Sequence, residues 1–147
     1  MEIEPGAERT RERLEVARRA LSSLQALPLG GPGEPAEQGA KLAADIVRDA
    51  AIQRFEYTFE ATWKAAQAYL TREGLDAASP RSAIRNSFQA GALDEADAQL
   101  ALEMLGDRNR SVHTYNEELA LTIFSRLETY AELLARWLNA LEERMGE

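Results

Sequence analysis

The chain has 147 residues, 45% of them hydrophobic, and a formal net charge of −8. This length suits one domain with its own core. It contains no cysteine, which excludes disulfides, thiol catalysis and cysteine-ligated metal sites. With a single histidine as well, we expect no zinc or di-iron site and no cofactor.

The charge pattern and the termini exclude further classes of protein. A general duplex-binding protein would be basic, so the acidic balance disfavours that class. No uninterrupted apolar run reaches the roughly 18 residues of a membrane span. The first thirteen residues are charged and lack the apolar region of a signal peptide, so the expected location is the cytoplasm.

Apolar residues spaced by three and four predict two long helices in the first half of the chain. The first runs from Glu8 to Leu27 and is ended by the glycine- and proline-rich connector 28–33, which lacks the pattern of a phosphate loop. The second runs from Glu37 to Arg72, with Gly74 as its C-cap. Its predicted apolar stripe is Leu42, Ile46, Ile52, Phe55, Phe59, Trp63, Ala66 and Leu70. We expect Arg54 and Glu56 to form an ion pair at its boundary.

Three more helices are predicted in the second half. A short one begins with Ser79 as N-cap and Pro80 at its first position, and ends at Gly91. The fourth runs from the N-cap Asp94 to about residue 108 or 110. The fifth is expected to start at a capping box formed by Thr114 and Glu117.

The fifth helix has the strongest periodicity. Its stripe is Leu119, Ile123, Leu127, Tyr130, Leu134, Trp137 and Leu141. No alternating strand pattern occurs, so the predicted fold is all-α. We expect a single domain, 1–147, formed by an antiparallel up-and-down four-helix bundle with an additional short helix.

The candidate site surrounds the only histidine, His113, which follows Arg108 by five residues. Histidine exchanges protons near neutral pH, and the arginine fork suits phosphate. In one continuous helix the two would point about 140° apart, so this site requires a break between them. Asn109 is a candidate for holding the leaving group or ribose, or else a helix cap. The alternative for His113 is a helix-end residue with structural hydrogen bonds.

Three more arginines, Arg81, Arg85 and Arg110, are candidates for binding RNA or a nucleotide, although surface arginines are often simply solvated. Metal-free RNA cleavage needs a general base, a general acid and positive charge at the phosphorane. One chain supplies one histidine. A two-fold homodimer would supply two around one cleft, so we expect a homodimer.

Arg108, His113 and Tyr115 resemble the signature of HEPN-domain toxins of the HepT type, in which four residues separate arginine from histidine and one separates histidine from tyrosine. The wider pattern resembles nucleotidyltransferase substrate-binding proteins. It includes residues 52–60, 63–64, 79–81, 90–91, 107–109 and 113–117, and covers the chain from about Asp49 onward.

The resemblance implies a HEPN-like helical bundle, a homodimer and a metal-independent endoribonuclease that uses Arg108 and His113. It also implies a partner nucleotidyltransferase that acts as antitoxin by transferring AMP to Tyr115, which would repel RNA. Two alternatives stay open: a non-catalytic subunit that presents substrate to a separate nucleotidyltransferase, and a plain helical oligomerisation domain.

Overall fold

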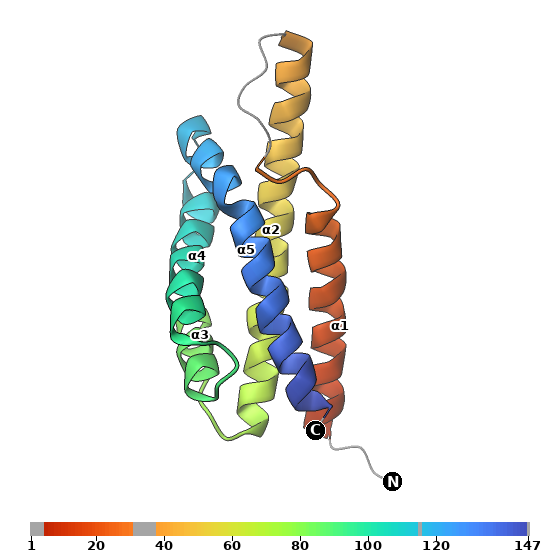
Figure 1. Cartoon of the computed structure of the whole chain (residues 1–147), viewed down its shortest axis with the longest axis vertical. Coiled ribbons are helices and arrows are strands. Elements are labelled where there is room, and N and C mark those ends of the chain that lie inside the picture. Colours follow the sequence, from red (N-terminus) through yellow and green to blue (C-terminus); the bar gives the residue numbers. More distant parts are fainter. Residues whose placement is uncertain (1–4, 31–37, 115, 147) are drawn as a thin grey trace.

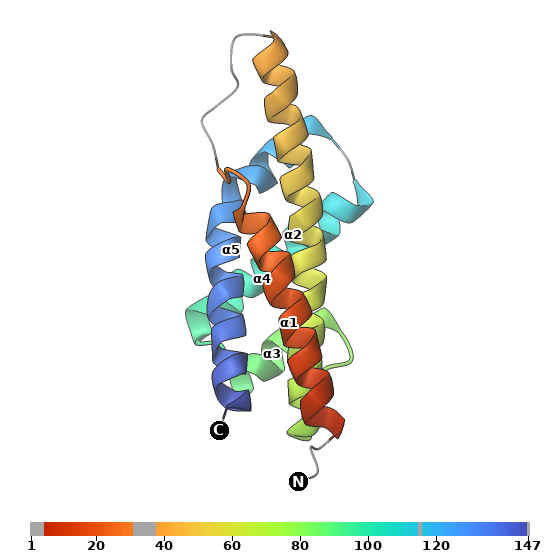
Figure 2. The ribbon, with the colours of Figure 1, turned by 90° about the vertical axis from the view of Figure 1, so that its right-hand side faces the viewer.

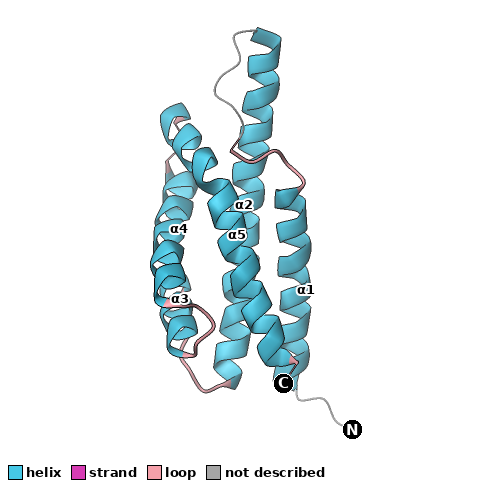
Figure 3. Ribbon diagram, viewed as in Figure 1, coloured by secondary structure: helices cyan, strands magenta, loops and turns pink. Residues whose placement is uncertain are grey.

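The computed structural model describes residues 5–30, 38–114 and 116–146. Throughout these ranges the regular secondary structure is helical (Figure 3). The five helices are α1 (Pro5–Gln25), α2 (Gln38–Arg72), α3 (Pro80–Gln89), α4 (Glu95–His113) and α5 (Glu117–Met145). The predicted all-α class is therefore confirmed, and each predicted helix is present within a few residues of its expected start.

The four long helices alternate in direction, so they form the predicted up-and-down bundle (Figure 1). The short α3 packs against α2 and α4 near the end of the bundle where the chain begins and finishes. Figure 2 shows α1, α2 and α5 running side by side along the long axis. None of the helices described is long and apolar enough to cross a membrane.

The stripe of α5 forms the centre of the core. Its six side chains from Ile123 to Leu141 are buried, and only Leu119 is partly exposed. Two of its aromatic residues also make specific contacts. Tyr130 stacks on Phe55 of α2 with ring centroids 5.6 Å apart, and Trp137 Nε1 donates to Ser87 Oγ of α3 at 3.1 Å. The stripe of α5 is thus buried almost completely by contacts within one chain.

The predicted stripe of α2 is wrong at its N-terminal end. Leu42 and Ile46 are 62% and 61% exposed. The first turns of α2 extend past the ends of the neighbouring helices (Figure 1). The apolar side chains of these turns therefore have no helix to pack against. From Phe55 onward the stripe is buried as expected.

The short helix α3 and the start of α4 begin as predicted. Ser79 and Ser82 form a reciprocal capping box, and Pro80 occupies the first turn of α3. Gly91, which follows α3, has φ +82°, a conformation that favours glycine. The Asp94 carboxylate accepts from the backbone N–H of Asp97 at 2.7 Å, as an N-cap does.

The boundary between α4 and α5 differs from the prediction. Thr114 ends α4, because its N–H donates to the Arg110 carbonyl at 2.9 Å. Asn116, and not Thr114, is the N-cap of α5: its side chain accepts from the N–H of Leu119 at 2.7 Å. The predicted capping box is therefore wrong, because Thr114 already serves the preceding helix.

Replacing Asn116 with alanine is expected to lower the free energy of unfolding by about 1 kcal/mol, since the first turn of α5 loses its cap. The matched control is Thr114→Ala, which removes a side chain with no hydrogen bond among the described residues. We expect it to stay within about 0.5 kcal/mol of the parent. Urea unfolding measures both. Equal losses would contradict this boundary.

Candidate active site

The arginine and histidine of the motif lie on one continuous helix. Arg108 and His113 both belong to α4, which ends at His113. The predicted break between them is wrong. The helix continues because its last turns are held from outside: Ser111 Oγ donates to Glu56 of α2 at 2.7 Å. The two motif side chains therefore leave the helix about 140° apart, and a site that uses both needs a further contribution.

Arg108 is anchored to α2 by an acid that the sequence analysis did not single out. Its Nη2 donates to Glu60 Oε2 at 2.7 Å, and its guanidinium lies 5.6 Å from the centroid of the Phe59 ring. The side chain keeps 25% of its surface exposed. The guanidinium of Arg108 is thus held in place by charge and an aromatic face, and the N–H groups that do not bind Glu60 or Asn109 are available to a ligand.

Glu60 is itself part of a small network. Burial raises the pKa of this carboxyl, but hydrogen bonds from Trp63 and Lys64 and the charge of Arg108 outweigh burial and hold the pKa below its usual range. Trp63 Nε1 donates to Glu60 Oε2 at 2.9 Å. The carboxylate therefore stays ionised and keeps Arg108 oriented.

Glu56 also has a role other than the expected one. The predicted Arg54–Glu56 ion pair is wrong, because residues two apart on a helix point to different sides. Glu56 faces α4 and accepts from Ser111, whereas Arg54 faces α1 and donates to the Ser23 carbonyl at 2.7 Å. Glu56 and Glu60, one turn apart, thus hold α2 against the motif end of α4.

His113 is an exposed residue at the C-terminal end of α4. Its side chain makes no hydrogen bond or ion pair with the described residues, so among them no partner is found for the alternative, structural role of this histidine. Its ring is accessible to a substrate. Tyr115, the predicted modification site, lies outside the described residues.

The residue before Arg108 is a buried acid. Asp107 is fully buried and accepts from Tyr130 Oη, Arg126 and Arg110. Burial raises the pKa of Asp107, but these hydrogen bonds outweigh burial and lower the pKa below its usual range. Asp107 thus ties the last turns of α4 to α5.

The other predicted site residues fall into two groups. Asn109 is exposed and its Oδ1 accepts from Arg108 Nη1 at 3.0 Å. It therefore sits beside the motif arginine, and the cap of α4 is Thr114 instead. Arg110 forms an ion pair with Asp107 and is about half exposed. Arg81 and Arg85 are exposed on α3, and no contact among the described residues joins them to Arg108, so their RNA-binding role stays a prediction.

A small cavity of about 150 Å³ opens beside the motif. Polar side chains, Gln53, Glu56, Ser111, Thr114 and Asn116 among them, surround apolar ones from α2 and α5. Within the described part of the chain, no group of three or more acidic, histidine or cysteine side chains is placed to hold a metal ion. The available chemistry is therefore that of an arginine fork, a histidine ring and neighbouring amides and hydroxyls.

Sequence reasoning assigned no role at the site to Glu56, Glu60 or Ser111, because no short motif joins these acids of α2 to the motif on α4. Glu60 lies 48 residues before Arg108, and a pairing of that length depends on the register of two helices. A weak signal was present: Glu56 and Glu60 are acids four apart on the helix that also contains Phe59.

Comparison with solved structures shows a shared fold. A crystal structure of a Thermus thermophilus protein is 48% identical, with a TM-score of 0.71, over 85% of this chain and 98% of that one. The tri-AMPylated HEPN toxin of Shewanella oneidensis, solved in complex with MNT antitoxin, is 18% identical with a TM-score of 0.70, over 91% of this chain and 96% of that one.

A mutant of the toxin–antitoxin pair MntA–HpeT is also 18% identical, with a TM-score of 0.69, over 91% of this chain and 97% of that one. At 18% identity the likenesses to these two structures show the fold alone. Comparison with curated proteins gives no significant match.

The family assignment comes from a sequence model. Residues 12–143 match the family described as nucleotidyltransferase substrate binding protein like. The predicted resemblance is therefore confirmed. It also begins earlier than the expected Asp49, so α1 is part of the shared pattern. Because the match spans most of the sequence, the chain belongs to the nucleotidyltransferase substrate binding protein-like family.

Proposed function

We propose that the protein is the HEPN-type toxin of a toxin–antitoxin pair, a metal-independent endoribonuclease neutralised by AMP transfer from a partner nucleotidyltransferase. The observation that carries this proposal is Arg108. It is anchored on Glu60 and Phe59 but still partly exposed, and the only histidine of the chain follows five residues later on the same helix. A fixed cation and an accessible imidazole suit phosphoryl chemistry once two copies of the chain bring them into one cleft.

The reaction we assign is transesterification of RNA. One His113 removes the proton of a ribose 2′-hydroxyl, whose oxygen attacks the adjacent phosphorus. The 5′-oxygen leaves and takes a proton from a second, protonated His113. The products are a 2′,3′-cyclic phosphate and a free 5′-hydroxyl. Arg108 stabilises the charge that develops on the phosphorane, and Asn109 binds the leaving group or the ribose.

The second histidine requires a homodimer. Arg108 and His113 of one chain diverge by about 140°, so a two-fold axis near the end of α4 would bring complementary side chains of two copies into one cleft. Exposed apolar side chains that such an interface could cover lie near this end of the bundle: Leu42, Ile46, Val112 and Leu121.

Growth on expression tests this function against the alternative of a non-catalytic substrate-binding subunit, which the family description and the acidic charge favour. The wild-type chain expressed alone is expected to arrest growth, and the cognate nucleotidyltransferase to relieve the arrest. Arg108→Ala at the same protein level should not arrest growth. Normal growth with abundant wild-type protein would favour the non-catalytic subunit.

Tyr115 is the expected site of modification. With ATP and the cognate nucleotidyltransferase, the intact mass should increase by whole AMP units, and peptide mapping should locate AMP on Tyr115. A phosphate two residues from His113 would repel RNA, so modified protein should lose cleavage. Tyr115→Phe should accept no label there. Modification elsewhere, or modified protein that still cleaves RNA, would contradict this role while leaving the ribonuclease proposal in place.

A further inference from the structure

A groove of about 420 Å³ runs between α1 and α2, on the side of α2 away from Arg108. The residues that matter here are Val16, Arg19 and Ser23 of α1 and Gln53, Arg54 and Tyr57 of α2. None of the described residues that line the groove is acidic, and two are arginines. In a chain with a net charge of −8, this is a locally cationic surface that fits an anion.

Two of the lining side chains are free to bind a ligand. Tyr57 is 60% exposed although it is a large aromatic residue. Within the part of the chain that the structure describes, neither Tyr57 nor Arg19 makes a hydrogen bond, ion pair or ring contact. Arg54 is different, since it donates to the Ser23 carbonyl and is held in place at the groove wall. An exposed ring beside two cations is the combination that binds single-stranded nucleic acid.

The groove adjoins the cavity beside the candidate active site. Gln53 lines both this groove and the cavity beside the motif. Tyr57 lies between Glu56 and Glu60 in α2, and these two acids contact Ser111 and Arg108 of α4. Tyr57 is therefore level with the motif along the axis of the bundle.

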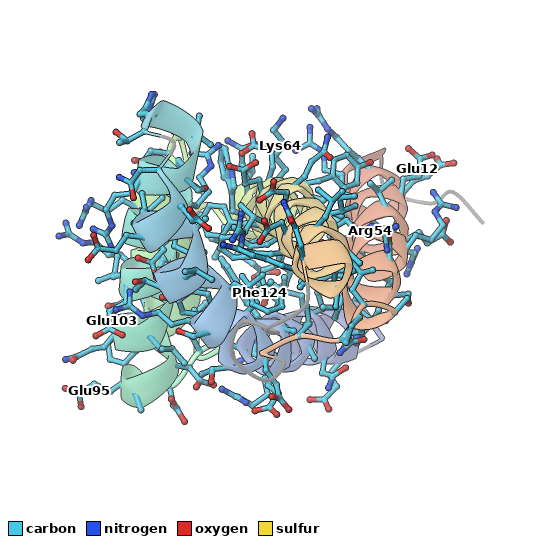
Figure 4. All side chains as sticks on the ribbon, turned by 90° about the horizontal axis from the view of Figure 1, so that it is seen from above. Glu12, Arg54, Lys64, Glu95, Glu103 and Phe124 are labelled. Atoms are coloured by element: carbon cyan, nitrogen blue, oxygen red, sulfur yellow. The ribbon has the colours of Figure 1, made fainter. Side chains whose placement is uncertain are left out.

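Seen along the bundle, α2 lies between α4 and α1, with Arg54 on the side toward α1 and Lys64 on the open edge between them (Figure 4). The exposed ridge of one helix, about 10 Å across, therefore separates the groove from Arg108.

We propose that this groove binds a nucleotide of single-stranded RNA next to the one that is cleaved. The base stacks on Tyr57, its phosphate binds Arg19 and Arg54, and the strand crosses α2 over Gln53 to reach Arg108. This inference rests on the proposed ribonuclease function and adds to it a substrate class, unpaired RNA, and a binding subsite. Stacking on an aromatic ring tolerates any base, so the groove gives affinity without strong sequence preference.

Binding of a short fluorescent single-stranded RNA, followed by anisotropy in a His113→Ala background that leaves the RNA intact, tests the subsite. Tyr57→Ala is expected to weaken binding about 10- to 100-fold, and Tyr57→Phe to bind as the parent does, because the ring remains. Arg19→Ala should weaken binding and reduce the salt dependence by about 0.7 in logarithmic slope, as loss of one phosphate contact does. Arg11→Ala, an exposed arginine of α1 outside the groove, is the matched control and should change neither.

The outcomes separate this inference from the proposed function. If wild-type protein cleaves RNA but Tyr57→Ala binds it as tightly as the parent, the subsite is wrong and the ribonuclease stands. If binding depends on Tyr57 but wild-type protein cleaves no RNA, the ribonuclease is wrong and the subsite stands. If Tyr57→Ala leaves RNA binding intact but weakens the homodimer or the nucleotidyltransferase complex, the groove is a protein interface and the inference is overturned.

Discussion

Arg108→Ala is expected to lower the rate of RNA cleavage by about 100- to 1,000-fold, the usual loss when one donor to a developing anion is removed. Arg108→Lys keeps the charge but not the two-pronged donor geometry, so an intermediate rate is expected. Both rates are measured on purified protein with labelled single-stranded RNA.

Arg108 also holds a structural ion pair, so the loss of rate must be separated from a loss of stability. The matched control is Arg136→Ala, which removes another interhelical arginine, one that donates to Asp97 at 3.0 and 2.9 Å. It lies on α5 and pairs with the first turn of α4, away from the motif. Comparable losses of rate in the two variants would show that Arg108 acts only through the fold.

The second large effect concerns Asp107. Asp107→Ala is expected to lower the free energy of unfolding by about 3 kcal/mol, because Tyr130 loses its buried acceptor and the arginines lose their anion. Tyr130→Phe removes one donor and should cost about 1 kcal/mol. Since Arg126 and Arg110 are about half exposed, water screens part of their contribution. Denaturant unfolding gives both values.

Asp97→Ala is the matched control for Asp107, because it removes an acid of the same helix whose partner, Arg136, is half exposed. It should cost no more than about 1 kcal/mol. A loss as large as that of Asp107→Ala would contradict the role given to the buried cluster.

The same cluster predicts a pH dependence. The pKa of Asp107 is lower in the folded chain than its unfolded value of about 3.9. Its ionised form therefore stabilises the fold above about pH 4, and this contribution is lost as the pH falls toward the depressed pKa. Asp107→Asn should flatten the acid limb of the stability profile. An unchanged limb would mean that other carboxylates cause it.

Local sequence rules were sufficient for much of the fold. Three signals that act within a few residues predicted helices that the structure contains. They are the apolar period of α5, the serine and proline at the start of α3, and the N-cap Asp94 of α4. The same rules failed at Leu42 and Ile46, which are exposed. Whether an apolar stripe is covered depends on where the neighbouring helices end, and periodicity does not contain that information.

The site was predictable only in part. The motif identified Arg108 and His113, but the break expected between them does not exist, because Ser111 and Asp107 hold the end of α4 in helical form. The anchoring acid, Glu60, depends on the register of α2 against α4. Registers are set by packing along whole helices, so no local pattern around either residue predicts the pair.

The most direct test of the account is RNA cleavage in the presence of EDTA. Purified wild-type protein is incubated with total RNA and tRNA, with and without EDTA, beside His113→Ala. We expect the wild type to give the same fragments in both conditions, with cyclic phosphate ends, and His113→Ala to be slower by about 10²- to 10⁴-fold. Cleavage abolished by EDTA, or retained in full by His113→Ala, would contradict a metal-independent ribonuclease built on Arg108 and His113.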